Sequence, residues 1–417
     1  MAATRTTLDA ILQEDYLPGT QEQLNNDIPL LAYAEKNTKD VEGRRAVLAP
    51  HVSRNSGIGA RAESGTLPTA QSQGYAEERI PLFYNYGRIN ISGPVMKSAQ
   101  SDKASFVRAV DSEMKGVTRD LKRDVNRQCW GDGTGAIAGF SGGGASSNTA
   151  TVIVPLATTN AGLGGSTAIG QLEPGMIVDV GTPTSPTLRA SGITLTRVSD
   201  ATALAASVLF GTAITASSTD FIFRTGSGGV VGTNQKEITG VQLIVDSSGT
   251  VFNVNPTTNP SWVAVEKSNS GTARSLSEPL IAAAAMDIQI AGGEDVNLAV
   301  GSPGVYRAFA NLQTSLKRFT NTTDLKGGWT GLEFAAGVKP FPITSDRDCP
   351  NGSLYLFNTN YLTQYQMSDW EWMDEDGSVL HMTTGIDAYE AVLYKYHELA
   401  TSKRNAHGKI VDITEAT

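Results

Sequence analysis

The most regular hydrophobic repeat in the chain runs through residues 101–130. The other faces of this stretch carry charges of both signs, among them Arg108, Asp111, Arg119, Lys122 and Arg123. Apolar side chains recur at spacings of four and three, as on one face of an α-helix: Phe106, Val110, Met114, Val117, Leu121, Val125 and Cys129. At about 1.5 Å per residue the helix spans about 40 Å, with Ser101 or Asp102 as its cap. The pattern predicts a long helix that is buried on one side only.

Residues 51–97 show a period of two instead. Ile80, Leu82 and Tyr84 would share one face of a strand, and Ile89 and Ile91 would share a face later. The preceding stretch is rich in Gly, Ser, Ala and Gln, which favours a polar tip between two long strands. Because such a hairpin has little to bury within a compact domain, we expect it to lie on another subunit. The alternative is a mobile surface loop.

Residues 1–50 lack a clear period. One short amphipathic piece, TLDAILQEDY, is followed by a mixture of charged and hydrophobic residues. Two interpretations remain open for this segment. It is either an extended arm that packs on a neighbouring subunit or an ordinary N-terminal helix that packs on its own domain.

Residues 137–235 change in composition. Short apolar runs at 176–178, 193–195, 207–210 and 221–223 are separated by Gly, Pro, Ser and Thr. Many short strands at such spacing favour a small all-β barrel or sandwich. The segment is therefore interpreted as an inserted β module.

From about residue 272 the pattern becomes mixed α/β. The stretch LSEPLIAAAAMDIQIAG predicts a helix capped by Ser277, and VNLAVGS predicts a buried strand. A second helix begins at Pro303, with Ser302 as its cap. Further on, residues 361–385 predict a hairpin that turns at Asp376 and Gly377, with Trp370 and Trp372 on one face.

The last part of the chain, AYEAVLYKYHELATSKRNAHGKIVDI, is expected to form strands, because Tyr389, Ala391, Leu393 and Lys395 alternate with other residues. Just before it lies an acidic cluster. We interpret this cluster as a solvated or inter-subunit surface rather than as a metal or catalytic site: Asp369, Glu371, Asp374, Glu375 and Asp376.

Composition narrows the class of protein. The chain has 417 residues, of which 40% are hydrophobic, and its formal net charge is −9. This charge disfavours a dedicated nucleic-acid binder, which would present a basic face. Cys129 and Cys349 are too far apart for a disulfide framework or zinc spacing. The N-terminus has no secretory apolar region, and the longest apolar stretch is too short for a membrane span, so we expect a soluble protein made inside the cell.

One glycine cluster raises the question of nucleotide binding. Residues 128–136, QCWGDGTGA, fit G-x-G-x-x-A through Gly131, Gly133 and Ala136. In a dinucleotide site the glycines follow a strand and open a helix, whereas here they follow a helix, whose C-terminal dipole repels phosphate. We therefore interpret Gly131 as the helix stop and Gly133 and Gly135 as a bend, in which one glycine has φ above zero.

The search for other chemistry finds little. No G-K-[ST] closes a glycine loop, no G-x-S-x-G is present, and the four histidines lack ligand spacing. No nucleophile, base and orienting group can be assembled. The sequence predicts neither an enzyme nor a cofactor or metal site. The order of its predicted structural elements is therefore the feature that tells most about function.

The order of parts resembles the tailed-phage major capsid proteins of the Hong Kong 97-like (Johnson) fold, an α+β fold. The similarity rests on the glycine exit GDGTG with AIAGF and on GTARSLSEPLI, SPGVYRAF, RFTNTTDLKGGWTGLEF, PITSDRDCPNGSLYLFN and DWEWMDEDG, in that order. The resemblance implies an N-terminal arm at 1–50, an E-loop hairpin at 51–97 and a peripheral domain with the spine helix at 98–149. It further implies an inserted β domain at 150–234, an axial domain at 235–365, and at 366–417 a peripheral hairpin whose C-terminal strands return to the axial domain.

The resemblance also implies a function. Copies of the chain would form hexamers and pentamers that close into an icosahedral virion shell around double-stranded DNA, touching the DNA only weakly and without specificity. Neighbouring subunits would contact the E-loop tip and the charged helix face, and no membrane is involved. The implied tip contacts are Arg61, Glu63, Leu67 and Pro68.

Further partners follow from the same resemblance. The chain has no room for a long scaffolding region before its arm, so the resemblance implies either a separate scaffolding protein or assembly without a scaffold. A portal and a maturation protease are expected as well, and a decoration protein is compatible. Some members of the family form Lys–Asn crosslinks. Lys97 and Lys103 are available here, but no motif marks a reacting pair, and crosslinking is not predicted.

Two alternatives stay open at this point. Another phage structural protein, such as a tail-tube, fibre or decoration protein, would share the β-rich composition but not the long helix. A β-rich hydrolase with a site at residues 369–376 would be a compact monomer with a deep pocket and a carboxyl group of raised pKa.

Overall fold

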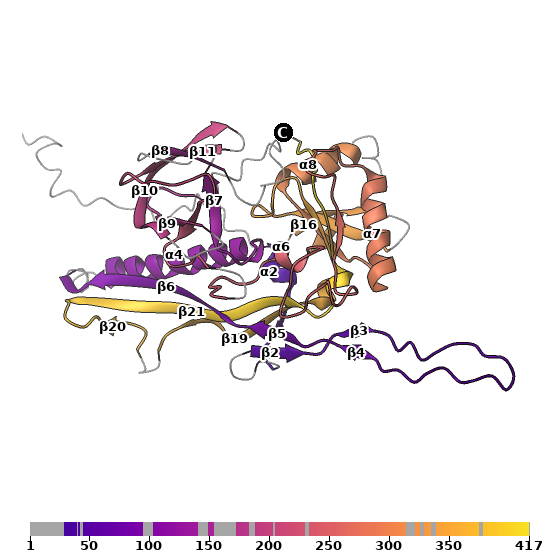
Figure 1. Cartoon of the computed structure of the whole chain (residues 1–417). Coiled ribbons are helices and arrows are strands. Elements are labelled where there is room, and N and C mark those ends of the chain that lie inside the picture. Colours follow the sequence, from indigo (N-terminus) through magenta and orange to yellow (C-terminus); the bar gives the residue numbers. More distant parts are fainter. Residues whose placement is uncertain are drawn as a thin grey trace, which may run out of the picture.

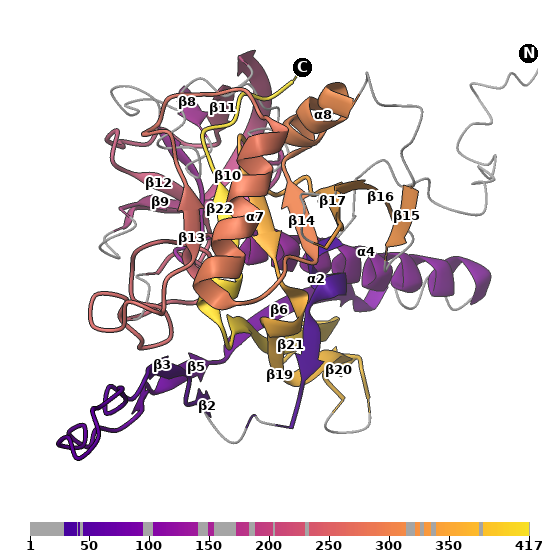
Figure 2. The same cartoon turned by 90° about the vertical axis from the view of Figure 1, so that its right-hand side faces the viewer.

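A computed structural model describes residues 29–39, 41, 45–94, 103–140, 149–153, 172–182, 188–202, 205–229, 233–313, 322–325, 329–334, 339–374 and 378–416. Its longest helix is α4 (Lys103–Cys129). In Figure 1 a β-barrel lies on one side of α4 and a mainly antiparallel sheet on the other. A second sheet, covered by α7 (Glu278–Gly292) and α8 (Pro303–Leu312), lies beyond the C-terminal end of α4 (Figures 1 and 2).

Helix α4 confirms the predicted long helix, while both candidate caps fall outside the described residues. Val125 and Cys129 of the apolar stripe are fully buried. The expectation of one-sided burial is wrong over the last turns, because Asn126, Arg127 and Gln128 are buried as well. These side chains contact other segments of the chain. Among the described residues no helix is both long and apolar enough to span a membrane.

The first sheet packs against the side of α4 away from the barrel. Its strands are β1 (Glu35–Asn37), β19 (Leu362–Trp372), β21 (Ala388–Thr401) and β20 (His381–Met382) in that order, and β6 (Phe83–Ser92) pairs with β21. Gly87 of β6 lies so close to α4 that a Cβ there would be 2.6 Å from Cγ1 of Val117. The absence of a side chain at Gly87 thus allows helix and sheet to approach.

Strand β6 corrects the prediction of one hairpin over 51–97. It pairs with β21 along its whole length, from His397 opposite Phe83 to Ala388 opposite Ser92, and so belongs to the body of the molecule. Tyr84 is 55% exposed, whereas Ile80 and Leu82 are buried. The three side chains therefore do not share a face, because a new strand begins at residue 83 and changes the alternation.

A narrow ribbon projects from the body, as Figure 1 shows. Two antiparallel pairs form its base, β2 (Arg45–Leu48) with β5 (Glu78–Pro81) and β3 (His51–Ser53) with β4 (Gly74–Tyr75). Residues 54–73 extend beyond these pairs without forming strands. The expected two long strands are thus four short ones near the body. We call residues 51–75 the ribbon.

The described part of the N-terminal segment packs on its own chain. Leu30, in α2 (Pro29–Tyr33), is fully buried, and Ala34 and Ala46 belong to the same hydrophobic cluster as Val125 of α4. This supports the own-domain interpretation for these residues. Residues 1–28, which include TLDAILQEDY, lie outside the described residues.

The inserted module is a closed barrel, which decides between the predicted barrel and sandwich. The strand order is β10 (Leu188–Thr202), β11 (Ala205–Phe210), β8 (Thr149–Ile153), β7 (Ala136–Phe140), β12 (Phe221–Arg224) and β9 (Ile177–Gly181). Its interior is apolar and includes Val178, Leu195, Phe210 and Ile222. The barrel begins at β7, before the expected boundary at residue 150, because the chain enters it directly from the glycine turn.

The second sheet has the order β13 (Val265–Lys267), β22 (Gly408–Ile410), β18 (Leu354–Phe357), β14 (Leu298–Gly301), β17 (Phe341–Ser345), β16 (Trp329–Phe334) and β15 (Thr322–Leu325). The predicted strand β14 is buried throughout. Oγ of Ser302 accepts a hydrogen bond from N of Val305, which confirms this cap, whereas Ser277 occupies the N-cap of α7 without a side-chain bond. Strand β22 brings the C-terminal segment back into this sheet, as expected.

Candidate functional site

The glycine turn after α4 is a crossing point of the chain. Gly133 and Gly135 have φ of 80° and 77°, which confirms the predicted left-handed bend. Gly131 has a further role that the sequence did not indicate. A Cβ on Gly240 would collide with O of Gly131, so the segment that returns from the barrel passes directly against this turn.

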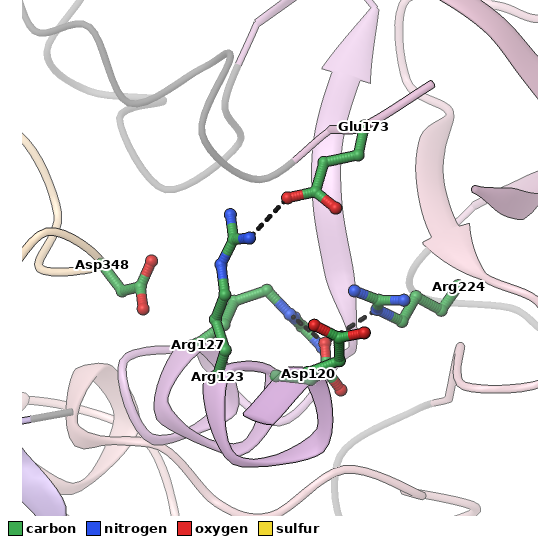
Figure 3. Close-up of a pocket in the computed structure, with 7 residues that line it drawn as sticks. Asp120, Arg123, Arg127, Glu173, Arg224 and Asp348 are labelled. Carbon is green, nitrogen blue, oxygen red and sulfur yellow. Dashed lines mark hydrogen bonds and ion pairs between the residues drawn. The ribbon is translucent and has the colours of Figure 1, made fainter. Parts of the chain in front are cut away.

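Beside this turn, α4, the barrel and the loop between β17 and β18 line an open cavity of about 110 Å³. We call it the junction cavity. Figure 3 shows acidic and basic side chains from these segments gathered around it. The lining residues are Asp120, Arg123, Asp124, Arg127, Glu173, Arg224 and Asp348.

Ion pairs across the junction cavity connect the surrounding segments. Nη2 of Arg127 is 2.6 Å from Oε1 of Glu237, and Nε of Arg127 is 3.0 Å from Oδ1 of Asp124. Nε of Arg224, on barrel strand β12, is 2.8 Å from the same oxygen of Asp124. The side chains of Arg127 and Glu237 are 8% and 6% exposed. The pair between the helix and the segment that leads to α6 (Val241–Ile244) is thus largely shielded from solvent, whereas the pair that connects the barrel includes the partly exposed Arg224.

The acidic and basic side chains around the cavity neutralise each other's charges. Burial alone would raise the pKa of Asp124, but the charges of Arg127 and Arg224 hold it below its usual range. Asp124 is therefore ionised and paired, and it has no free base function. The arrangement stabilises the joint between segments and contains no nucleophile with an adjacent base.

The predicted charged face of the helix is only partly free. Nη1 of Arg123 is 2.5 Å from Oε1 of Glu173, at the entry to barrel strand β9, so Arg123 forms a pair within the chain. Nζ of Lys122 lies 6.0 Å from the ring centroid of Trp370. Arg119 is exposed and has an interaction of its own. The side chains of Arg108 and Asp111 lie outside the described residues.

The predicted tip contacts lie on the outermost part of the ribbon. Leu67 is 81% exposed, Arg61 and Glu63 are exposed, and Pro68 is half-buried. Arg61 donates to the backbone, with 2.9 Å between its Nε and O of Thr66. The guanidinium thus helps to shape the tip.

The predicted hairpin at Asp376 and Gly377 is wrong in its pairing, and these two residues lie outside the described ones. Strand β19 pairs with β21, with Trp372 opposite Leu393, and the short β20 pairs with β21 rather than with β19. Strand β21 is long and can form more backbone hydrogen bonds with β19 than the short segment after the turn can. It therefore pairs with β19 in place of that segment.

Of the acidic cluster before this turn, Asp369 is bound to cationic side chains, and Glu375 and Asp376 lie outside the described residues. Asp369 lies within hydrogen-bond distance of two lysines, 2.6 Å from Nζ of Lys36 and 2.9 Å from Nζ of Lys395. Partial burial would raise the pKa of Asp369, but these two bonds hold it below its usual range. This is opposite to the shift that the hydrolase alternative requires. Lys395 is 2% exposed and also lies 4.9 Å from the ring centroid of Trp370. Among the described residues, no three His, Cys, Asp or Glu side chains form a metal-binding group.

Sequence reasoning missed Arg404, which is fully buried. Its guanidinium donates to backbone carbonyls of α6 and the following loop: Ile244 at 2.9 Å, Leu243 at 3.1 Å, Ser248 at 2.8 Å and Gly249 at 3.0 Å. These carbonyls include the C-terminal end of α6, where cations are favourable. An arginine in a turn-like stretch of sequence gives no sign that it will bind buried carbonyl groups. The ion pair of Arg127 and Glu237 was missed as well, because the two residues are far apart in the sequence.

The chain matches known proteins over most of its length. The family model of the SU10 major capsid protein matches residues 88–414. No curated protein matches the sequence. The capsid asymmetric unit of cyanophage A-1(L) superposes with a TM-score of 0.57 at 14% identity, covering 99% of this chain and 100% of that one. This likeness confirms the expected fold.

Two further solved capsids are similar over nearly the whole chain. A native GTA particle gives a TM-score of 0.48 at 9% identity, with 100% of both chains covered. The Myoviridae phage XM1 gives 0.44 at 11% identity, with 97% of both chains covered. On the family match, the chain belongs to the SU10 major capsid protein family and is a shell-forming major capsid protein of a tailed phage.

Proposed function

We propose that copies of this protein assemble into hexamers and pentamers, that these close an icosahedral shell around double-stranded DNA, and that the ribbon contacts a neighbouring subunit during closure. One observation carries the proposal for the ribbon. From Arg54 to Gln73, a stretch described in full, no residue is buried, and Ile58 and Leu67 are 79% and 81% exposed. A segment this long without a core of its own is stabilised by burial on another chain.

The charge of the chain fits a shell around DNA. With a net charge of −9 the protein lacks the overall basic character of a tight phosphate binder. Weak contact leaves the genome free to move during packaging. The proposed partners beyond other copies are a separate scaffolding protein, a portal and a maturation protease, with a decoration protein as a compatible addition; the proposed place of synthesis is the bacterial cytoplasm.

The test is to shorten the ribbon while its base is kept. Residues 56–71 are replaced by a short Gly-Ser linker, so that β3 and β4 can still pair. We expect the variant to melt as the wild type does by circular dichroism, but to give capsomers without closed shells by electron microscopy. The point variant Leu67→Ser should reduce closure in the same direction, with Ala70→Ser on the same ribbon as its control. Closed shells of normal shape from the shortened chain would refute the ribbon's role.

A further inference from the structure

Two carboxyl groups are buried side by side next to the C-terminal end of α4. Asp346 and Asp348, in the loop between β17 and β18, are 1% and 6% exposed. Both face one side-chain amide. Nδ2 of Asn126 is 3.2 Å from Oδ1 of Asp346 and 2.8 Å from Oδ2 of Asp348. The backbone N of Asp348 also donates to Oδ1 of Asp346, at 2.9 Å.

The side chains around Asp346 and Asp348 do not supply enough positive charge to offset two carboxylates. Asn126 is neutral and can donate hydrogen bonds but offers no positive charge. Arg347, half-buried in the same loop, acts on both carboxylates, but it also lies near Arg123 and Glu173. Arg123 and Arg127 line the junction cavity together with Asp348, but they pair with Glu173 and with Asp124 and Glu237. The buried thiols of Cys129 and Cys349 are also close, and burial raises their pKa values first and the two carboxylates raise them further. These thiols stay neutral and provide no counter-charge.

Two carboxylates that share one buried site cannot both stay ionised without a cost. Burial, and after it the charge of Asp348, raises the pKa of Asp346 to about 6. Asp348 also lines the junction cavity, which gives the pair a route to solvent.

We propose that Asp346, buried beside Asp348, binds one proton as the pH falls, and that this proton stabilises the contact between the 346–352 loop and the end of α4. The proton comes from solvent and forms an O–H bond on a carboxylate oxygen of Asp346. That hydroxyl then donates to a carboxylate oxygen of Asp348, and the pair goes from two negative charges to one. Repulsion between two like charges is replaced by a hydrogen bond.

The loop transmits this change to the second sheet. N of Asp346 donates to O of Gly301, at the end of β14, with 3.1 Å between them. At its other end, N of Gly352 donates to Oε1 of Glu415, at 3.0 Å. The protonation state of the pair therefore sets how firmly the second sheet is held on α4.

Amide hydrogen exchange in the full-length protein tests the proposal locally. Exchange of residues 346–352, corrected for the intrinsic effect of pH, is compared at about pH 5 and about pH 7.5. For the wild type we expect about tenfold slower exchange at the lower pH, which corresponds to about one pKa unit of linkage. Asp346→Asn places a permanent donor opposite Asp348 and should make exchange slow at both pH values. Glu63→Gln, on the exposed ribbon, should behave as the wild type.

Two outcomes would overturn the proposal. Wild-type exchange that does not change with pH would exclude a titrating pair. Slowing by added Mg²⁺ or Ca²⁺ at the higher pH, without any effect of pH alone, would show that the pair binds a metal ion instead of a proton. If Asp346→Asn does not fold, infrared difference spectra of the wild type decide: a protonated carboxyl band must appear as the pH falls, and in Asp348→Asn it must appear only at lower pH.

Discussion

Arg127 and Glu237 form an ion pair with 2.6 Å between Nη2 and Oε1, and their side chains are 8% and 6% exposed. One partner lies on the last turn of α4 and the other on the segment that returns from the barrel. The whole barrel is therefore inserted between two residues that contact each other. This pair closes the base of the inserted module and fixes the point at which the chain leaves and re-enters the body.

Removing one partner of this pair should be strongly destabilising. Arg127→Met leaves the buried Glu237 without its counter-charge and leaves Asp124 with Arg224 alone, and we expect the free energy of unfolding to fall by about 3–5 kcal/mol. Denaturant unfolding of unassembled subunits measures the loss. Arg79→Ala, which breaks the exposed pair with Glu77, should leave the unfolding midpoint unchanged. Equal effects of the two substitutions would contradict the structural role of the buried pair.

Two glycines with positive φ allow backbone strain and steric crowding to be separated. Gly135 and Gly175 have φ of 77° and 90°, but only at Gly135 would a Cβ be crowded, 2.9 Å from O of Ser227. Gly175→Ala should cost about 1–2 kcal/mol of stability through its backbone conformation. Gly135→Ala should cost more, because the segment at Ser227 must also move. Thermal melts that rank the two variants in the opposite order would show that crowding does not limit this turn.

Arg404 can be tested by a substitution that keeps its charge. Lysine cannot reproduce the planar fork of donors that reaches the carbonyls of Leu243, Ile244 and Ser248. We expect Arg404→Lys to reduce the free energy of unfolding by about 2–4 kcal/mol, since several buried carbonyls lose their donors. Chemical denaturation provides the measurement, with Lys403→Arg as the neighbouring control. A variant as stable as the wild type would mean that water replaces the guanidinium.

Two buried histidines predict a loss of stability in acid. Burial, and then the charge of Lys395, lowers the pKa of His397 to about 3, and burial lowers that of His407 to about 3. The unfolded chain takes up these protons near pH 6.5. The stability that these two neutral imidazoles contribute is therefore fully present above about pH 6.5 and decreases as the pH falls toward about 3, by up to about 1.4 kcal/mol per pH unit for each histidine.

Denaturant midpoints over this pH range check the histidine prediction. His397→Gln should show a smaller pH slope than the wild type, while His51→Gln on the exposed ribbon should keep the wild-type slope. An unchanged slope in His397→Gln would remove His397 from the explanation. This global effect has the opposite sign to that expected for Asp346, so the carboxyl pair is better followed by local exchange than by global unfolding.

The local elements of the fold follow closely from local sequence. The spacing from Phe106 to Cys129 gives α4, and Pro303 after Ser302 gives the start of α8, because periodicity and capping act within a few residues. The left-handed bend after Gly131 was predictable for the same reason. The order of parts was also enough to indicate the capsid family, which the family match confirms.

Partners and pairings between distant segments were decided only by the tertiary structure. The alternation at Ile89 and Ile91 predicts a strand but not that β21 is its partner, since a period of two is the same in a projecting hairpin and in a body sheet. Likewise, Asp124, Arg127 and Glu237 are ordinary charged residues in the sequence. They become a buried network because the barrel and the returning segment exclude water from the end of α4, and burial depends on segments brought together over long stretches of chain.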